Sequence, residues 1–168
     1  MTAQSGVPHC NRVGDFDTFA LLKLQKQGLA LDDIFRRLGK EGGMLGMSGV
    51  SPDMRDIERA AGEGNARARL AIDAFVESVR HFIGSYLVAL NGCDVLAFTG
   101  GIGENGAAIR SAVCRNLAFA GIELDETKNN VRGKETKISA DGSKADIWIV
   151  PTNEELIVAR QTVEALRA

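Results

Sequence analysis

The sequence has few cysteines, histidines and prolines, and neither sign of charge is in large excess. Its 168 residues include three cysteines, two histidines and three prolines, and the formal net charge is −2. The cysteines and histidines lack the spacing of a zinc site, and an odd number of cysteines argues against a disulfide framework. Because no basic patch is available to neutralise phosphates, we expect no binding to nucleic acid.

Long hydrophobic runs are also missing. No apolar stretch approaches the roughly 20 residues that a membrane-spanning helix needs, and the polar first 14 residues do not read as a signal peptide. Dispersed thiols are typical of a reducing compartment. We therefore expect a cytoplasmic protein without a membrane partner, long enough to bury the core of one domain.

Helical patterns dominate the first half of the chain. Apolar residues at helical spacing predict helices over residues 18–27, 31–38 and 66–90. Dense glycines over residues 39–49 predict a linker or functional loop rather than a regular helix. Ser51, followed by a proline, predicts the start of the next helix, because serine caps free backbone N–H groups.

Strands are expected in the second half. Two short apolar runs, residues 94–98 and 145–150, predict buried strands, and residues 136–139 predict an edge strand. Helices are expected to follow over residues 107–119 and 153–166. The alternation of strand, loop and helix predicts a helix-rich α/β fold.

The most informative segment is FTGGIGENG at residues 98–106, between the first strand and its helix. A strand that passes through glycines into a helix presents backbone N–H groups to a phosphate, or its backbone to a flat nucleotide ring. Gly101, Gly103 and Gly106 also match the G-x-G-x-x-G pattern of dinucleotide-binding proteins.

An NAD-binding, Rossmann-like protein is therefore one alternative. Glu123 and Asp125 lie about twenty positions after the glycines, where the dinucleotide fingerprint requires an acidic residue. However, the strand that should carry them would be only residues 121–124, and the motif falls late in the chain. The pattern is loose enough that a purely structural turn also explains it.

A second glycine-rich turn, MSGVSPDMR at residues 47–55, brings Asp53 and Arg55 into the first turn of a helix. Asp53 could accept hydrogen bonds from a ribose or adenine, and Arg55 could stack on a ring or pair with phosphate. A simple capped helix with a solvated arginine explains the same residues.

Two further segments place charges where phosphoryl transfer needs them. Residues 150–155 (VPTNEE) put adjacent carboxylates after a strand, and magnesium takes one or two carboxylates with phosphate oxygens. Residues 11–17 (NRVGDFD) put Arg12 on a glycine turn, and arginine stabilises a phosphoryl group in transfer. Helix-dipole stabilisation and a solvated ion pair remain the simpler alternatives.

In this order, the four segments resemble the acetate/propionate kinase family. The run ending FTGGIGEN at Asn105 is similar to the family's adenosine-binding signature, and PTNEEL at residues 151–156 to its magnesium segment. MLGMSGVSPDMR at residues 44–55 is similar to its second nucleotide-contacting loop, and RVGDFD at residues 12–17 to its arginine-bearing loop. The resemblance implies a helix-rich part of an actin-like, RNase H-like ATPase domain.

The resemblance also implies roles. ATP and Mg²⁺ would be the cofactors, Glu154 would help to hold the magnesium, and Arg12 would stabilise the transferring phosphoryl group. The reaction would convert ATP and a short-chain carboxylate, acetate or propionate, to ADP and an acyl phosphate. The residues implied to contact the nucleotide are Asp53, Met54, Arg55, Gly101, Ile102, Gly103, Glu104 and Asn105.

From the resemblance, we expect no counterpart in residues 1–168 to the family's N-terminal domain, with its catalytic aspartate and carboxylate pocket. Residues 1–168 are therefore expected to be the C-terminal, ATP-binding portion of a carboxylate kinase, inactive alone. Because exposed strand edges invite pairing, we expect a homodimer or a complex with an N-terminal half. A non-catalytic nucleotide-binding fragment and a structural remnant stay open as alternatives.

Overall fold

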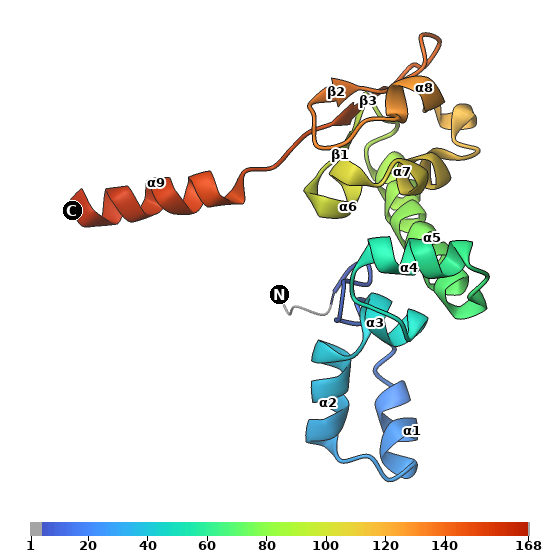
Figure 1. Ribbon diagram of the computed structural model, residues 1–168, viewed down its shortest axis with the longest axis vertical. Coiled ribbons are helices and arrows are strands. Elements are labelled where there is room, and N and C mark those ends of the chain that lie inside the picture. Colours follow the sequence, from blue (N-terminus) through green and yellow to red (C-terminus); the bar gives the residue numbers. More distant parts are fainter. Residues whose placement is uncertain (1–4, 168) are drawn as a thin grey trace. The chain divides into compact units, whose positions relative to one another are not determined.

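The computed structural model describes residues 5–167, apart from the side chain of Glu154. The chain divides into two compact units, one up to Ser85 and one from Tyr86 onward. The longest helix, α5 (Ala66–Ala89), contributes residues to both (Figure 1). Among the described residues, no helix combines the length and the apolar character needed to cross a bilayer.

The first unit is helical. Besides most of α5 it contains α1 (Ala20–Lys26), α2 (Leu31–Lys40), α3 (Gly43–Ser48) and α4 (Met54–Gly62). The predicted helices over residues 18–27, 31–38 and 66–90 are thereby confirmed, with ends that differ by at most two residues. Its core contains apolar side chains from α2, α3, α4 and α5: Ile34, Met44, Met54, Ile57, Ala68, Ala71, Ile72, Phe75 and Val76.

The prediction that residues 39–49 form no regular helix was wrong, because α3 lies within them. Tertiary packing overrides the low helix propensity of glycine here. Met44 and Ser48 are buried, so one face of α3 belongs to the core. Gly43 has a φ of +56°, and a Cβ at this position would overlap the carbonyl oxygens of His9 and Arg12.

The predicted cap of the following helix was also wrong. The N-cap of α4 is Asp53, whose Oδ1 accepts a hydrogen bond of 2.9 Å from the backbone N–H of Arg55. Ser51 instead supports the preceding turn: its Oγ accepts from the N–H of Asp53 at 3.1 Å and donates to Asp56 at 2.9 Å. Aspartate takes the cap because its carboxylate also favours the positive end of the helix dipole.

The second unit has a three-stranded sheet with the order β1-β3-β2. Strand β1 runs parallel to β3, with Phe98 opposite Ile149, and β2 runs antiparallel to β3 at the other edge. The helix-rich α/β architecture and the edge strand are confirmed. The elements of this unit are β1 (Val95–Phe98), α6 (Gly100–Asn105), α7 (Ala107–Cys114), a 3₁₀ turn (Ala118–Ala120), α8 (Glu126–Asn129), β2 (Thr136–Lys137), β3 (Asp146–Ile149) and α9 (Glu154–Arg167).

Burial in the sheet is unequal. Ile147 and Ile149 of the central strand β3 are fully buried, as the sequence predicted. The prediction of a buried first strand was wrong, because β1 is at the edge of the sheet and Val95 is 58% exposed. The predicted helix over residues 107–119 ends early, at Cys114, and Asn116 then adopts a φ of +60°.

Candidate functional site

The two parallel strands lead directly into two of the segments singled out from the sequence. At its carboxyl end β1 passes through Thr99 into α6, and β3 passes through residues 150–153 into α9 (Figure 1). The N–H of Val150 donates to the carbonyl of Phe98 at 2.9 Å, so the two strands end at the same level. In open α/β sheets, ligands bind outside the carboxyl ends of the strands.

The segment predicted as a glycine loop is the short helix α6. Gly101 is exposed and a Cβ there would meet nothing within 4 Å, so a ligand can approach its backbone. At Gly103 a Cβ would lie 3.3 Å from the carbonyl carbon of Phe98, so glycine lets α6 pack closely on the end of β1. Ile102, between them, is half-buried. The backbone at Gly101 is therefore open to a ligand such as a planar ring.

A side chain from α6 caps its own first turn. Gly100 has a φ of +71°, and its N–H donates to Oε1 of Glu104 at 2.9 Å. Asn105 donates from Nδ2 to the carbonyl of Gly101 at 3.0 Å. Since the Gly100 N–H already has a carboxylate partner, it is not open to a phosphate. This favours the ring-binding alternative for the segment over the phosphate-binding one.

Glu104 also joins the two segments at the carboxyl edge. Its Oε1 accepts from the N–H of Thr152 at 3.0 Å and from the Thr152 hydroxyl at 3.1 Å. These bonds, chiefly the one from the Thr152 N–H, and the one from Gly100 hold the pKa of Glu104 below its usual range. The carboxylate is therefore ionised at neutral pH.

A buried arginine supports α6 from the other side. Arg110 of α7 is fully buried and donates from one terminal nitrogen to the carbonyl of Gly103 at 2.8 Å. Its other donors reach the side-chain and main-chain oxygens of Asn129 and the carbonyl of Val131. Burial lowers the pKa of Arg110, although the group stays charged at any accessible pH. Sequence reasoning missed this residue, because an arginine in the middle of a helix normally faces solvent.

In the first unit, Asp53 and Arg55 bind each other. Besides capping α4, the Asp53 carboxylate accepts from the Arg55 guanidinium, with a shortest nitrogen–oxygen distance of 2.5 Å. The hydrogen bonds from the Arg55 side chain and N–H lower the pKa of Asp53 to about 2. The Arg55 side chain is 85% exposed, whereas Met54 between them is buried in the core. Asp53 and Arg55 are thus accessible to a ligand, and Met54 could offer one only its backbone.

Arg12 lies on a turn that α3 holds in place. The N–H of His9 donates to the Arg12 carbonyl at 3.0 Å, and the N–H of Met44 donates to the His9 carbonyl at 2.9 Å. Arg12 itself is half-buried. Arg12, Asp53 and Arg55 therefore belong to the first unit, whereas the α6 segment belongs to the second.

The predicted magnesium residue, Glu154, begins α9, and its side chain lies outside the described part of the structure. Among the residues that are described, no three of the types His, Cys, Asp and Glu gather closely enough to hold a metal ion. A glutamate at the start of α9 is nevertheless suitable for magnesium, because this ion takes one or two protein carboxylates and completes its shell with phosphate oxygens and water.

The structure lacks the strand arrangement that the dinucleotide fingerprint requires in the described part of the chain. The strand next to β1 is β3, whereas residues 121–124 contribute only an isolated bridge between Leu124 and Ser139. Asp125 caps α8, accepting from the N–H groups of Thr127 and Lys128 at 2.9 and 3.0 Å. The acidic residue that a ribose would need is therefore not at the end of a strand beside β1.

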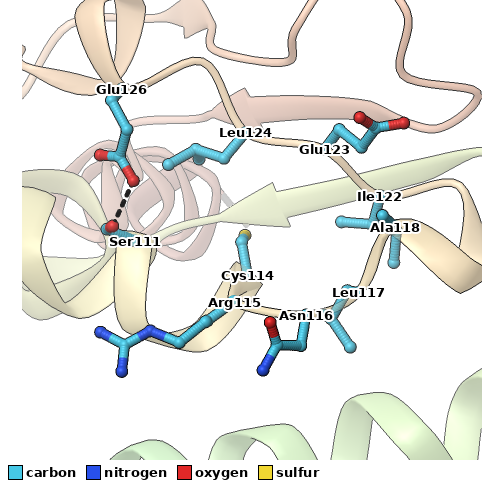
Figure 2. Close-up of a pocket in the computed structure, with 10 residues that line it drawn as sticks. All are labelled: Ser111, Cys114, Arg115, Asn116, Leu117, Ala118, Ile122, Glu123, Leu124 and Glu126. Atoms are coloured by element: carbon cyan, nitrogen blue, oxygen red, sulfur yellow. Dashed lines mark hydrogen bonds between the residues drawn. The ribbon is translucent and has the colours of Figure 1, made fainter.

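One surface pocket of about 280 Å³ lies between α7 and α8 (Figure 2). Ser111 and Glu126 are hydrogen-bonded to each other at one side, and Glu123 lies at the other side. None of the lining residues belongs to the four segments singled out from the sequence. The pocket is therefore separate from the edge where β1 and β3 end.

Comparison with known proteins gives one consistent result. Residues 1–160 match the model of the acetokinase family. An acetate kinase of Natranaerobius thermophilus is 47% identical over 163 residues, which are 96% of this chain and 41% of the relative. The crystal structure of Porphyromonas gingivalis acetate kinase superimposes with a TM-score of 0.90 at 41% identity, and it covers 98% of this chain and 42% of that one. A propionate kinase from Francisella tularensis superimposes with a TM-score of 0.84 at 36% identity, covering 94% of this chain and 40% of that one.

Proposed function

Because the chain belongs to the acetokinase family and spans about two fifths of the length of its relatives, we propose that it is the C-terminal, nucleotide-binding portion of a carboxylate kinase. The proposed reaction transfers the terminal phosphoryl group of ATP to acetate, propionate or a similar short-chain carboxylate. Its products are ADP and an acyl phosphate. This chain would supply the ATP and magnesium part of the site.

The observation that carries the proposal is the meeting of two segments at the carboxyl edge of the parallel pair. FTGGIGEN follows β1 and PTNEEL follows β3, and Glu104 joins them through Thr152. An open backbone on one strand end and a carboxylate-bearing helix start on the next are suitable for a nucleotide and its magnesium. A structural turn alone would require neither an exposed glycine nor hydrogen bonds between the two segments.

Each candidate residue would have a role in the proposed site that follows from its chemistry. Gly101, Ile102, Gly103 and Asn105 would form the face for the adenosine. Asp53 and Arg55 would contact the ribose or the ring. Part of the ion pair between them would then be replaced by hydrogen bonds to the ligand. Glu154 would hold the magnesium, which supplies charge neutralisation on the phosphates. Arg12 would stabilise the phosphoryl group in transfer.

We also propose that the chain is inactive alone. Phosphoryl transfer depends on positioning and on stabilising charge at the transferring group, so a site without its acceptor pocket loses nearly all of its effect. Groups that act as a unit in catalysis are strongly non-additive. The partner would be an N-terminal half or a second copy of the chain. A cytoplasmic location stays a prediction from the sequence.

The test is acyl phosphate formation, trapped as the hydroxamate, with ATP, Mg²⁺ and acetate or propionate. The chain is assayed alone and mixed with the N-terminal part of the Porphyromonas gingivalis acetate kinase. We expect product only from the mixture, and we expect Arg12→Ala or Glu154→Ala in this chain to abolish it. Turnover by the lone chain that Arg12→Ala removes would contradict the proposal of half a site.

A further inference from the structure

Glu104 accepts hydrogen bonds from two segments that are far apart in sequence. Its Oε1 receives the N–H of Gly100 in its own helix and both the N–H and the hydroxyl of Thr152, 48 residues away. We infer that Glu104 is a positioning residue, which fixes the segment between β3 and α9 against the start of α6 and acts on the bound nucleotide through Thr152. This inference rests on the proposed function of the same edge.

The position of Thr152 explains why its hydrogen bonds to Glu104 are important for the start of α9. Thr152 lies between the end of β3 at Ile149 and the start of α9 at Glu154. Apolar side chains on the first turns of α9 are not held in a core, since Leu156 is 43% and Ile157 58% exposed. The bonds from Thr152 to Glu104 therefore contribute much of what places the beginning of α9.

The chemistry of both residues suits this task better than that of their close analogues. A carboxylate that accepts from N–H and O–H groups forms charge-assisted bonds, which are about twice as strong as neutral ones. Threonine supplies two donors that converge on one oxygen, so the bond fixes both the position and the orientation of its backbone. Glutamine at 104 would keep the shape and lose the charge, and valine at 152 would keep the shape and lose one donor.

Direct contact with the nucleotide is the competing role for Glu104. If the carboxylate acted on the ligand itself, its replacement would weaken binding independently of residue 152. If it acts through Thr152, the two replacements are coupled, because each one weakens the same connection. A double-mutant cycle separates the two roles.

The experiment compares the wild-type chain with Glu104→Gln, Thr152→Val and the double variant. Glu123→Gln serves as the matched control, since Glu123 is an exposed carboxylate of the same unit at the separate pocket. The affinity for ADP is measured by calorimetry with Mg²⁺ and with EDTA. Amide hydrogen exchange at Thr152 is measured in the absence of ligand.

We expect Glu104→Gln to weaken ADP–Mg²⁺ binding about three- to tenfold, because glutamine keeps an acceptor oxygen and loses the charge, a loss comparable to about one neutral hydrogen bond. The loss should be smaller in EDTA, because the start of α9 carries the proposed magnesium residue. Thr152→Val should weaken binding less, and the double variant no more than Glu104→Gln alone. Exchange at Thr152 should accelerate in Glu104→Gln and stay unchanged in the control.

Two results would overturn the inference. One is additive losses in the double variant, which would mean that Glu104 and Thr152 act separately. The other is unchanged exchange at Thr152 in Glu104→Gln. A wild-type chain that bound no ADP would contradict the proposed function instead, and the exchange measurement would then decide the positioning role alone.

Discussion

Replacing Arg110 by methionine removes a buried cation and every hydrogen bond that it donates. The guanidinium reaches Oδ1 of Asn129 at 2.7 Å, the Asn129 carbonyl at 2.7 Å, the Gly103 carbonyl at 2.8 Å and the Val131 carbonyl at 2.9 Å. Methionine fills most of the volume but leaves these four oxygens without that donor. The two on Asn129 are the most costly, because they are buried and water does not replace the arginine there.

The expected cost follows from these contacts. A hydrogen bond to a charged group contributes about 1.5–3 kcal/mol, and the cost of burying the cation offsets part of the sum. We therefore expect Arg110→Met to lower the free energy of unfolding by about 3–5 kcal/mol. Arg110→Lys should cost about 2 kcal/mol, because an ammonium keeps the charge and cannot span all four acceptors.

Urea unfolding followed by fluorescence measures the effect, since Trp148 in β3 is the single tryptophan of the chain. Arg132→Met is the matched control. Arg132 is an exposed arginine next to Val131, one of the residues that accept from Arg110, and its loss should change the free energy of unfolding by less than about 0.5 kcal/mol. A decrease below about 1 kcal/mol for Arg110→Met would refute the reasoning. It would mean that Arg110 does not hold α6 and α8 together.

Three smaller predictions concern the first unit. NMR titration should give Asp53 a pKa of about 2 instead of the ordinary 3.8, and Arg55→Gln should raise it. Since the folded pKa is the lower one, the stabilisation from this pair is fully present above the unfolded pKa and disappears as the pH falls toward 2. Gly43→Ala should destabilise the chain by more than about 2 kcal/mol, because it combines positive φ with overlap on the Arg12 carbonyl. At Gly62, where a Cβ meets nothing within 4 Å, alanine should be neutral or stabilising in a thermal melt.

The sequence was a good guide to elements with strong local patterns. The stripe on α5 is a periodic pattern, and β1 and β3 are short apolar runs; both signals lie in neighbouring residues and can be recognised from the sequence alone. The pattern could not reveal that β1 is an edge strand, because a short apolar run looks the same in the centre of a sheet. It also could not reveal α3, since only the packing of Met44 and the close approach at Gly43 overcome the glycines around them.

The residues of the candidate site show the same limit. Glycines around Gly101 are visible in the sequence, because a strand–glycine–helix order has a direct structural meaning. The support of that segment is not visible, because it comes from side chains distant in sequence. Arg110 joins α6 to Asn129 and Val131, which lie 19 and 21 positions after the arginine, and Glu104 joins α6 to Thr152. No local pattern encodes such contacts, and the one between Glu104 and Thr152 depends on the register of β1 against β3.

The central claim is that the carboxyl edge of β1 and β3 binds an adenine nucleotide with magnesium. Calorimetric titration of the chain with ADP–Mg²⁺ and, separately, with NAD tests it most directly. The account predicts measurable binding of ADP–Mg²⁺ and none of NAD, with the ADP signal reduced by Glu154→Ala. Tighter binding of NAD, or no binding of ADP–Mg²⁺ by a folded chain, would contradict it.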